Sequence, residues 1–442
     1  MKKEHILRIG FGMADITPLE SVQLGGLGGP EGSRMSTEII DPLKTICIAI
    51  TDENDETVIF NVNDLCQIID ITNMREPTAQ ATGVPVDHIF LASTHTHSAP
   101  GIEYEMPEAK RYGAMVADRT AIAAAEAMRD RKPARLEIAY AYPENLNFCR
   151  RYVNTEGKIY NSTIKTMTMA GPESPADNQM QILRIVREGG KDIILTNFQS
   201  HHHGEVARNW FTGVSYNFFG VYRKYMEEKT GCHVAYFSGA GGNLAAGNLY
   251  EPHLVVATGY VDHGQRLGDY ALKATDFKPL KTGPIQITRR TYTGNVRKSS
   301  PELVALAQKV REVSRTEGKE KAMAMLEGTP IDNLYHVGGI CANAKLPDTI
   351  TATLTSVAIG DWGIATAPCE LYDTLGKQIK EGSPFEATMI FQLCNGSIGY
   401  IPSKIAYSHG GYEINTTKFQ EGTGEGFRDA YLDMLKQMKE EQ

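Results

Sequence analysis

Short apolar runs rich in β-branched residues alternate with amphipathic stretches along most of this 442-residue chain. Most of the runs end at Gly, Pro, Asn or Asp, which is typical of β-strands. The pattern predicts strands at residues 45–50, 57–62, 88–92, 135–141, 181–186, 192–198, 233–237, 285–288, 352–359 and 387–393. Helical spacing of apolar residues predicts helices at about residues 109–129, 218–229, 264–274, 301–327, 370–381 and 424–439. This mixture indicates an α/β fold in which helices flank a large mixed β-sheet or a pair of sheets.

The chain contains no internal repeat and no low-complexity linker, so we expect residues 1–442 to form a single domain. Residues 297–347 open with a charged helical stretch, and we expect a helical cap or insertion there. The predicted strands between residues 135 and 198 follow one another with little helix between them. This argues against a (β/α)₈ amidohydrolase barrel, which needs eight regular strand–helix units.

Composition excludes several classes of function. The 45 Lys and Arg residues against 53 Asp and Glu give a net charge of −8, and no basic block is present, so nucleic acid is not an expected partner. No apolar run approaches the roughly 18 residues that cross a bilayer, and the N-terminus has no signal-peptide pattern. The seven cysteines are scattered and contain no CxxC pair. We therefore expect reduced thiols and a cytoplasmic protein, and the oligomeric state stays open.

Two histidines follow the predicted strand at residues 88–92. Residues 94–97 read Thr-His-Thr-His, and the chain then breaks at a Pro-Gly pair. In extended backbone, residues i and i+2 project to one face, so His95 and His97 would point the same way. Two imidazoles that converge at the end of a strand suit zinc. The alternative is a pair of polar residues that close the strand through backbone hydrogen bonds.

A second histidine cluster follows the predicted strand at residues 192–198. It reads His201-His202-His203, and chance or surface exposure explains many such triplets. Here the arrangement of a strand followed by histidines occurs twice, which favours convergence of the two clusters. We expect one of the three histidines to reach a metal and the other two to serve local roles.

A carboxylate and two phenols complete the candidate set. Glu370 follows an apolar run and lies at the start of the helix predicted for residues 370–381, where the helix N-terminus alone also favours an anion. Tyr400 and Tyr412 lie on glycine-containing loops and, taken alone, would be packing residues. The glycines at 239–242 lack the Lys and the spacing of a phosphate-binding P-loop.

Taken together, these motifs resemble the catalytic domain of the neutral (non-lysosomal) ceramidases. The resemblance is carried, in the family's order, by residues 12–18, 93–101, 198–201, 239–243, 368–370, 395–402 and 411–413. It therefore spans nearly the whole chain and implies the α/β fold of that catalytic domain. The elements Ala-Asp-Ile-Thr-Pro and Thr-His-Thr-His are specific in combination.

The resemblance implies roles for seven residues. Four would hold one zinc ion: His95, His201, Glu370 and Tyr400, with His97 as the alternative to His95. Three would act on the substrate: His97 as a catalytic or orienting neighbour, Arg150 as a substrate-binding group, and Tyr412 as a donor to the developing oxyanion. The family hydrolyses the amide of an N-acylated sphingoid base, and zinc there would polarise the carbonyl and lower the pKa of water. Iron, nickel or manganese also suit a nitrogen and oxygen site.

The chain departs from the family pattern at two positions. Asn243 and Ala245 stand where the family has Asp and Ser, so a mechanism that needs that hydroxyl is closed. The sequence also ends at Gln442, where the family continues into an immunoglobulin-like domain, so we expect the catalytic domain alone.

We therefore expect a ceramidase-like zinc hydrolase that cleaves an amide, or an ester, of a small N-acylated or polar substrate by activated water. Ceramide itself, and with it a role in sphingolipid metabolism, is the family's substrate rather than one that these residues specify. One alternative is a pseudoenzyme or binding protein that kept the pocket but lost catalysis. The other is a zinc enzyme that acts on a sugar or polyol.

Overall fold

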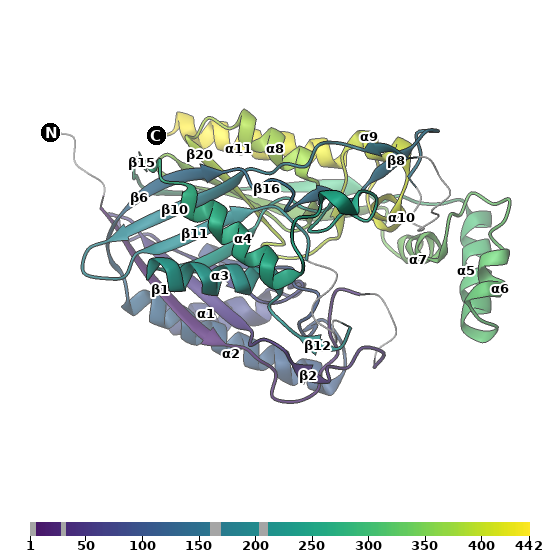
Figure 1. Ribbon diagram of the computed structural model, residues 1–442, viewed down its shortest axis with the longest axis horizontal. Helices are drawn as coiled ribbons and strands as arrows, with labels where there is room; N and C mark the ends of the chain where they lie inside the picture. The colour runs from purple at the N-terminus through teal and green to yellow at the C-terminus, as the bar shows by residue number, and fades with distance from the viewer. Residues whose placement is uncertain (1–5, 28–31, 160–168, 203–210) are drawn as a thin grey trace.

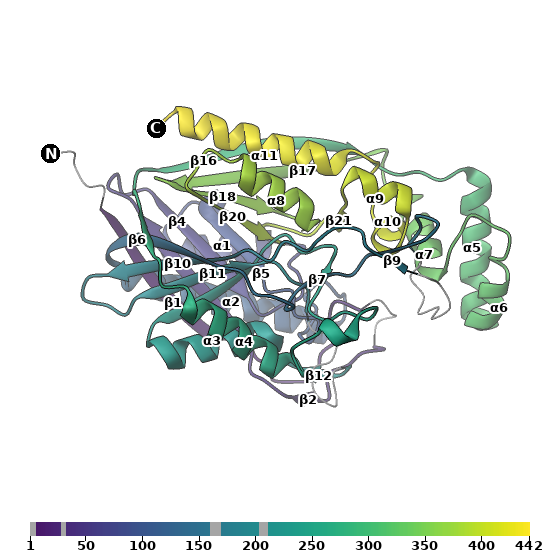
Figure 2. The same cartoon turned by 45° about the horizontal axis from the view of Figure 1, so that its top comes forward.

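The computed structural model describes residues 6–27, 32–159, 169–202 and 211–442. Two β-sheets lie face to face, with helices α1–α4 on one side of the pair and α8 and α11 on the other (Figures 1 and 2). The predicted α/β fold with a large mixed sheet is therefore confirmed. Among the described residues, no helix has both the length and the apolar character needed to cross a membrane.

The larger sheet has the strand order β13-β11-β10-β6-β1-β3-β4-β5, and β15 also pairs with β6. Its strands are β1 Leu7–Asp15, β3 Lys44–Thr51, β4 Thr57–Asn63, β5 Ile89–Ser93, β6 Lys132–Ala141, β10 Met180–Arg187, β11 Ile193–Phe198, β13 His233–Ser238 and β15 Lys278–Leu280. The pairs β4–β5 and β11–β13 are parallel, whereas the pairs β6–β10 and β10–β11 are antiparallel. Because the described residues between these antiparallel strands contain no helix, and because the strands form two packed sheets, the fold is not a (β/α)₈ barrel.

The smaller sheet packs its apolar face against the larger one. It has the order β16-β17-β18-β20, with strands β16 Ile285–Asn295, β17 Thr349–Ile359, β18 Trp362–Ala367 and β20 Ala387–Gln392. Phe60 on β4 contacts Trp362 and Phe391, with ring centroids 6.1 and 5.6 Å apart. Phe237 on β13 stacks on Phe391 at 4.3 Å. These buried rings join the two sheets into one core.

Six helices cover the outer faces of the sheets: α1 Thr72–Thr82, α2 Pro107–Arg129, α3 Asn217–Thr230, α4 Tyr260–Lys273, α8 Asp373–Gly382 and α11 Thr423–Glu440. Strand β1 and helix α1 had no counterpart in the sequence prediction. Glycines interrupt β1 because α2 lies close to it: a Cβ on Gly10 or Gly12 would stand about 2 Å from a carbonyl oxygen of α2. Helix α1 contains Pro77, which weakened its helical pattern.

Residues 301–343 form three helices that project from the end of the molecule (Figure 1). They are α5 Pro301–Thr316, α6 Lys319–Ala324 and α7 Leu334–Asn343. The single helix predicted for residues 301–327 is wrong, because the chain turns at Gly318, whose φ is +101°. The three helices bury a small apolar cluster of their own. A role of this segment as a cap over a site stays a prediction.

Short strands pair in twos outside the main sheets: β2 Glu38–Ile39 with β12 Gly213–Val214, β7 Phe148–Cys149 with β14 Leu244–Ala245, β8 Tyr152–Asn154 with β9 Met169–Pro172, and β19 Glu370–Leu371 with β21 Tyr400–Ile401. Two short helices, α9 Lys404–His409 and α10 Tyr412–Thr416, follow β21. The pairs β19–β21 and β7–β14 and helix α10 carry most of the remaining predicted site residues.

Candidate functional site

The two histidines of the Thr-His-Thr-His motif lie beyond the end of β5, on a turn. His95 has a φ of +68°, a left-handed conformation that is uncommon for residues other than glycine. The prediction that His95 and His97 share one face of an extended strand is therefore wrong. The turn nevertheless brings the two rings together, and their Nε2 atoms lie 3.2 Å apart.

His201 is the member of the His triplet that reaches this pair. It follows β11, and its Nε2 lies 3.2 Å from that of His95. The His202 ring stacks on His97 with a centroid distance of 3.8 Å. His203 lies outside the described residues. The expected convergence of the two strand-end clusters is thus present in the structure, with His201 in the central position.

Glu370 lies on β19, not at the start of a helix as the sequence predicted. Helix α8 begins at Asp373, and β19 pairs in parallel with β21, so Glu370 and Tyr400 are register partners. This pairing holds Glu370 in a buried position with its Oε2 3.3 Å from His95 Nε2. Residues from three distant parts of the sequence therefore meet at one point.

The donor atoms fit a divalent cation. Nε2 of His95, Nε2 of His201 and a carboxylate oxygen of Glu370 are buried and lie within 4.8 Å of one another. His95 Nδ1 lies 2.8 Å from the backbone oxygen of Cys66 and donates to it, which leaves Nε2 with its lone pair facing the cluster. Two imidazole nitrogens and a carboxylate are the donor set that zinc accepts.

The pKa values of the histidines agree with this arrangement. Burial lowers the pKa of His97 and His201 well below the ordinary value, so both rings are neutral at pH 7. Burial acts on His95 in the same direction, but its interactions with the Cys66 thiol and the Glu370 carboxylate outweigh burial and hold its pKa well above the ordinary value. The cluster thus stabilises a positive charge between His95 and Glu370, and a proton or a metal cation can supply it.

Arg150 and two tyrosines border the cluster. Arg150 Nη2 donates to the Tyr400 hydroxyl at 3.1 Å and to the Gly242 carbonyl at 3.0 Å. The ring of Tyr412 contacts that of Tyr400, with centroids 5.8 Å apart. Burial and the Glu370 charge raise the pKa of Tyr400 well above its usual value and that of Tyr412 to about 12. Both phenols therefore keep their protons at neutral pH.

Sequence reasoning missed the residues that hold Arg150. Glu413 is buried, and its two carboxylate oxygens accept from Arg150 Nε and Arg151 Nη1, each at 2.7 Å. Arg151 also makes two hydrogen bonds to Glu173, at 2.8 and 3.0 Å. In the sequence, only the position of Glu413 next to Tyr412 pointed to a role at the site. The ion pair between Arg151 and Glu413 joins residues 262 positions apart and leaves no local sequence pattern.

No family model matches the sequence, and no curated protein matches it. Solved structures do match its fold. A neutral ceramidase from Pseudomonas aeruginosa superposes with a TM-score of 0.72 and 18% identity, covering 99% of this chain and 75% of the other. A ceramidase complexed with C2 gives a TM-score of 0.73 and 18% identity, covering 99% and 76%.

The chain has the neutral ceramidase fold. The likeness covers the chain almost from end to end, and so confirms the fold that the motif resemblance implied. The sequence differs from the family pattern at Asn243 and Ala245. The structure explains the residue at position 243.

Asn243 forms a reciprocal pair with a buried carboxylate. Its Nδ2 donates to Asp373 Oδ1 at 2.6 Å, and its Oδ1 accepts from the Asp373 backbone N–H at 2.8 Å. Burial raises the pKa of Asp373 to about 6. An amide is the partner that such a carboxylate needs, because a second carboxylate would bring two negative charges together. Ala245 lies on β14 opposite Phe148, and nothing in the structure explains its difference from Ser.

The substitution Asn243→Asp should make stability depend strongly on pH. An Asp whose folded pKa lies above its unfolded value of about 3.9 binds extra protons in the folded state, so stability falls as pH rises through that interval. In the variant the two carboxyls would share one proton and extend the interval upward. We expect a loss of about 2 kcal/mol in the free energy of unfolding at pH 8 and a smaller loss at pH 5.

Urea denaturation at the two pH values measures this loss. Asn54→Asp provides the control, since Asn54 is exposed. An equal loss at pH 5 and pH 8 would contradict the charge pairing of Asn243 with Asp373.

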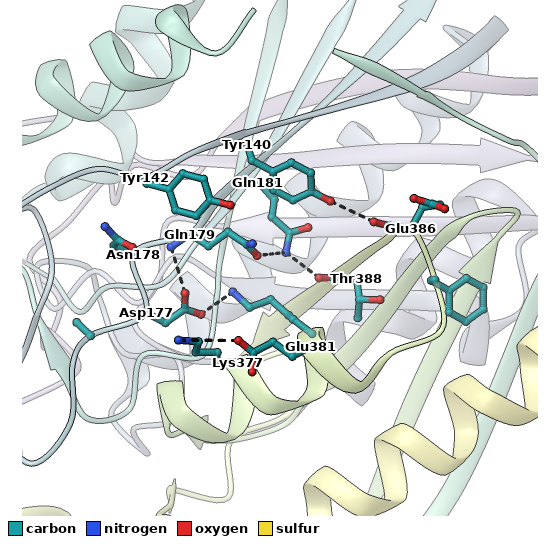
Figure 3. Close-up of a pocket in the computed structure, with 13 residues that line it drawn as sticks. Tyr140, Tyr142, Asp177, Asn178, Gln179, Gln181, Lys377, Glu381, Glu386 and Thr388 are labelled. Carbon is teal, nitrogen blue, oxygen red and sulfur yellow. Dashed lines mark hydrogen bonds and ion pairs between the residues drawn. The ribbon is translucent and has the colours of Figure 1, made fainter. Parts of the chain in front are cut away.

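The pocket in Figure 3 is lined by residues outside the histidine cluster. It has a volume of about 470 Å³ and a polar lining, in which Lys380 pairs with Asp177 at 2.5 Å and Tyr140 donates to the Glu386 backbone oxygen at 3.2 Å. None of the seven predicted site residues lines it. The polar side chains of this pocket largely bond to one another. The side-chain atoms that could bind a metal ion together lie instead at the histidine cluster. We therefore place the candidate site at the cluster.

Proposed function

We propose that this protein is a zinc-dependent hydrolase that cleaves an amide, or an ester, of a small N-acylated or polar substrate. The observation that carries the proposal is the buried set of His95, His201 and Glu370, whose donor atoms lie within 4.8 Å of one another. Their convergence within the neutral ceramidase fold supports it further. Glu370 Oε2 is buried and has no hydrogen-bond partner among the described residues. Burying such an acceptor lowers the stability of the folded state unless a cation or a donor interacts with it.

His95, His201, Glu370 and Tyr400 would hold the metal, with Tyr400 placed by its strand pairing with Glu370. When bound, zinc would act as a Lewis acid that polarises a carbonyl and lowers the pKa of water to about 7. The Cys66 carbonyl fixes the tautomer of His95, so that its Nε2 stays free to coordinate.

His97 supplies a proton acceptor beside this set. Its ring is neutral at pH 7 because burial lowers its pKa, and its Nε2 lies 3.2 Å from that of His95. It would therefore take a proton from the attacking water and return it to the leaving amine. Stacking on His202 holds the His97 ring in place.

Tyr412 and Arg150 supply donors on the other side. The Tyr412 hydroxyl keeps its proton up to about pH 12 and would donate to the oxygen that becomes negative in the tetrahedral intermediate. Arg150 carries a fixed positive charge near Tyr400 and would bind a hydroxyl or anionic group of the substrate. Because residue 245 is Ala, that position offers no hydroxyl nucleophile, and water would attack the carbonyl instead.

Metal analysis and a hydrolysis assay test the proposal. After a chelator removes metal, we expect the protein to take up about one equivalent of zinc and to release acid from N-acetyl or acetyl-ester substrates only in the zinc-loaded form. Uptake of less than about half an equivalent would argue against the metal site. Full uptake without hydrolysis across the panel would favour a binding protein or a reaction of another kind.

A further inference from the structure

The peptide group of Asp177 is bonded to three segments that are remote from one another in the sequence. Its carbonyl oxygen accepts from Asn147 Nδ2 and from Gln199 Nε2, each at 2.7 Å. Its N–H donates to Asp373 Oδ2 at 3.0 Å. All four residues are buried, so water does not compete for these bonds. A single peptide unit therefore holds the three segments together.

Two of the residues bonded to this peptide precede residues of the candidate site. Asn147 is three positions before Arg150. Gln199 follows β11 and is two positions before His201. Asn147 Nδ2 also donates to the Gln199 carbonyl oxygen at 2.9 Å, so the two segments are bonded to each other as well as to Asp177. The spacing between Arg150 and His201 therefore depends on the position of Asp177.

Asp373 connects Asp177 to the segment that carries Glu370. It begins α8, three positions after Glu370. Asp373 Oδ1 accepts from Asn243 Nδ2 at 2.6 Å, and the Asn243 carbonyl oxygen accepts from the Arg150 backbone N–H at 3.0 Å. The bonds of Asp177 thus belong to a closed loop of contacts that includes the segments of Arg150 and Glu370.

Lys380 on α8 anchors the side chain of Asp177. The two charged groups lie 2.5 Å apart, and both side chains are more than nine-tenths buried. Both residues line the pocket of Figure 3. Burial and the charge of Asp177 raise the pKa of Asp373 to about 6, so at pH 8 two buried carboxylates repel each other. Without Lys380, the Asp177 carboxylate would have no cation to offset this repulsion and its own burial.

We propose that the Lys380–Asp177 ion pair positions the ligands of the metal site by holding the Asp177 peptide in place. This inference rests on the proposed metal site, since the pair would fix His201 and Glu370 relative to each other. The pair acts through the hydrogen bonds of Asp177 with Asn147, Gln199 and Asp373. A metal site requires ligand distances that are correct to within about 0.2 Å. Loss of the pair should therefore weaken zinc binding in a protein that still folds.

The zinc affinity of the full-length protein tests this role. It is measured at pH 8 by competition with a fluorescent chelator, after bound metal has been removed. We expect Lys380→Met to weaken zinc binding by about tenfold, the lower end of the range for residues that support metal ligands. Lys380→Arg keeps the positive charge and should bind zinc within about twofold of wild type. Asp177→Asn keeps the peptide group but removes the ion pair, and should weaken binding by at least about threefold.

Lys377→Met is the matched control, because Lys377 lies on the same helix, lines the same pocket and stands 3.9 Å from Glu381 in an exposed pair. It should leave zinc affinity unchanged, and thermal melts of all variants report folding.

Wild-type zinc affinity in folded Lys380→Met overturns the inference, and Asp177→Asn decides in the same way if Lys380→Met does not fold. An equal loss in Lys377→Met also overturns it, because the charge of the pocket would then explain the effect. A loss in Lys380→Met that Lys380→Arg reverses upholds the positioning role even if no form of the protein hydrolyses a substrate. Failure of wild type to bind zinc would remove the metal site and this inference together.

Discussion

Glu370→Gln should lower the affinity for zinc by at least about 100-fold. The expected loss exceeds the 10- to 100-fold that follows removal of groups which only support metal ligands, because the substitution removes a carboxylate that faces His95 Nε2 at 3.3 Å. Hydrolysis should fall with zinc occupancy at any metal concentration below the new Kd. Competition with a fluorescent chelator measures the affinity, and acid release measures turnover.

The matched control for this change is Glu386→Gln, which removes an exposed carboxylate. Its zinc affinity should equal that of wild type. Zinc should also raise the melting temperature of wild type and of the control, but not that of Glu370→Gln at the same zinc concentration, because only a ligand that binds the folded state stabilises it. Unchanged zinc affinity in Glu370→Gln would remove this residue from the metal site.

Glu413→Gln should destabilise the protein by about 3–5 kcal/mol, the cost of removing one partner from a buried ion pair. Glu413 accepts from Arg150 and Arg151 at 2.7 Å, and the side chains of Glu413 and Arg151 are almost completely buried. The neutral amide would leave two guanidinium groups with one counter-charge fewer. Urea denaturation gives the free energy of unfolding, and we expect turnover to fall as well, because Arg150 loses its anchor.

An exposed pair serves as the reference for this measurement. Glu421 lies 3.7 Å from Lys404, and both side chains are at least half exposed. Glu421→Gln should therefore change the free energy of unfolding by less than about 1 kcal/mol. If Glu413→Gln is as mild as this control, the network does not hold Arg150 in place.

The sequence located the candidate site more reliably than it described its geometry. His95 and His97 were expected to converge because of extended backbone, yet they meet because the chain turns at a positive φ. Glu370 was expected at a helix N-terminus, yet a two-residue strand holds it. In each case the residue type was informative because few other roles suit a buried histidine or carboxylate, while local periodicity is too short to specify a turn or a two-residue strand.

The sequence by itself determined the α/β class and the positions of most of the main strands, because the apolar runs that form buried strands and the turn residues between them are local features. Only the tertiary structure decided that Glu413 holds Arg150, that Asn243 pairs with Asp373, and that the Tyr335 ring contacts that of Tyr412. Those contacts join residues from 77 to 263 positions apart. Their energy depends on burial and distance, which exist only after the two sheets and the projecting helices have packed together.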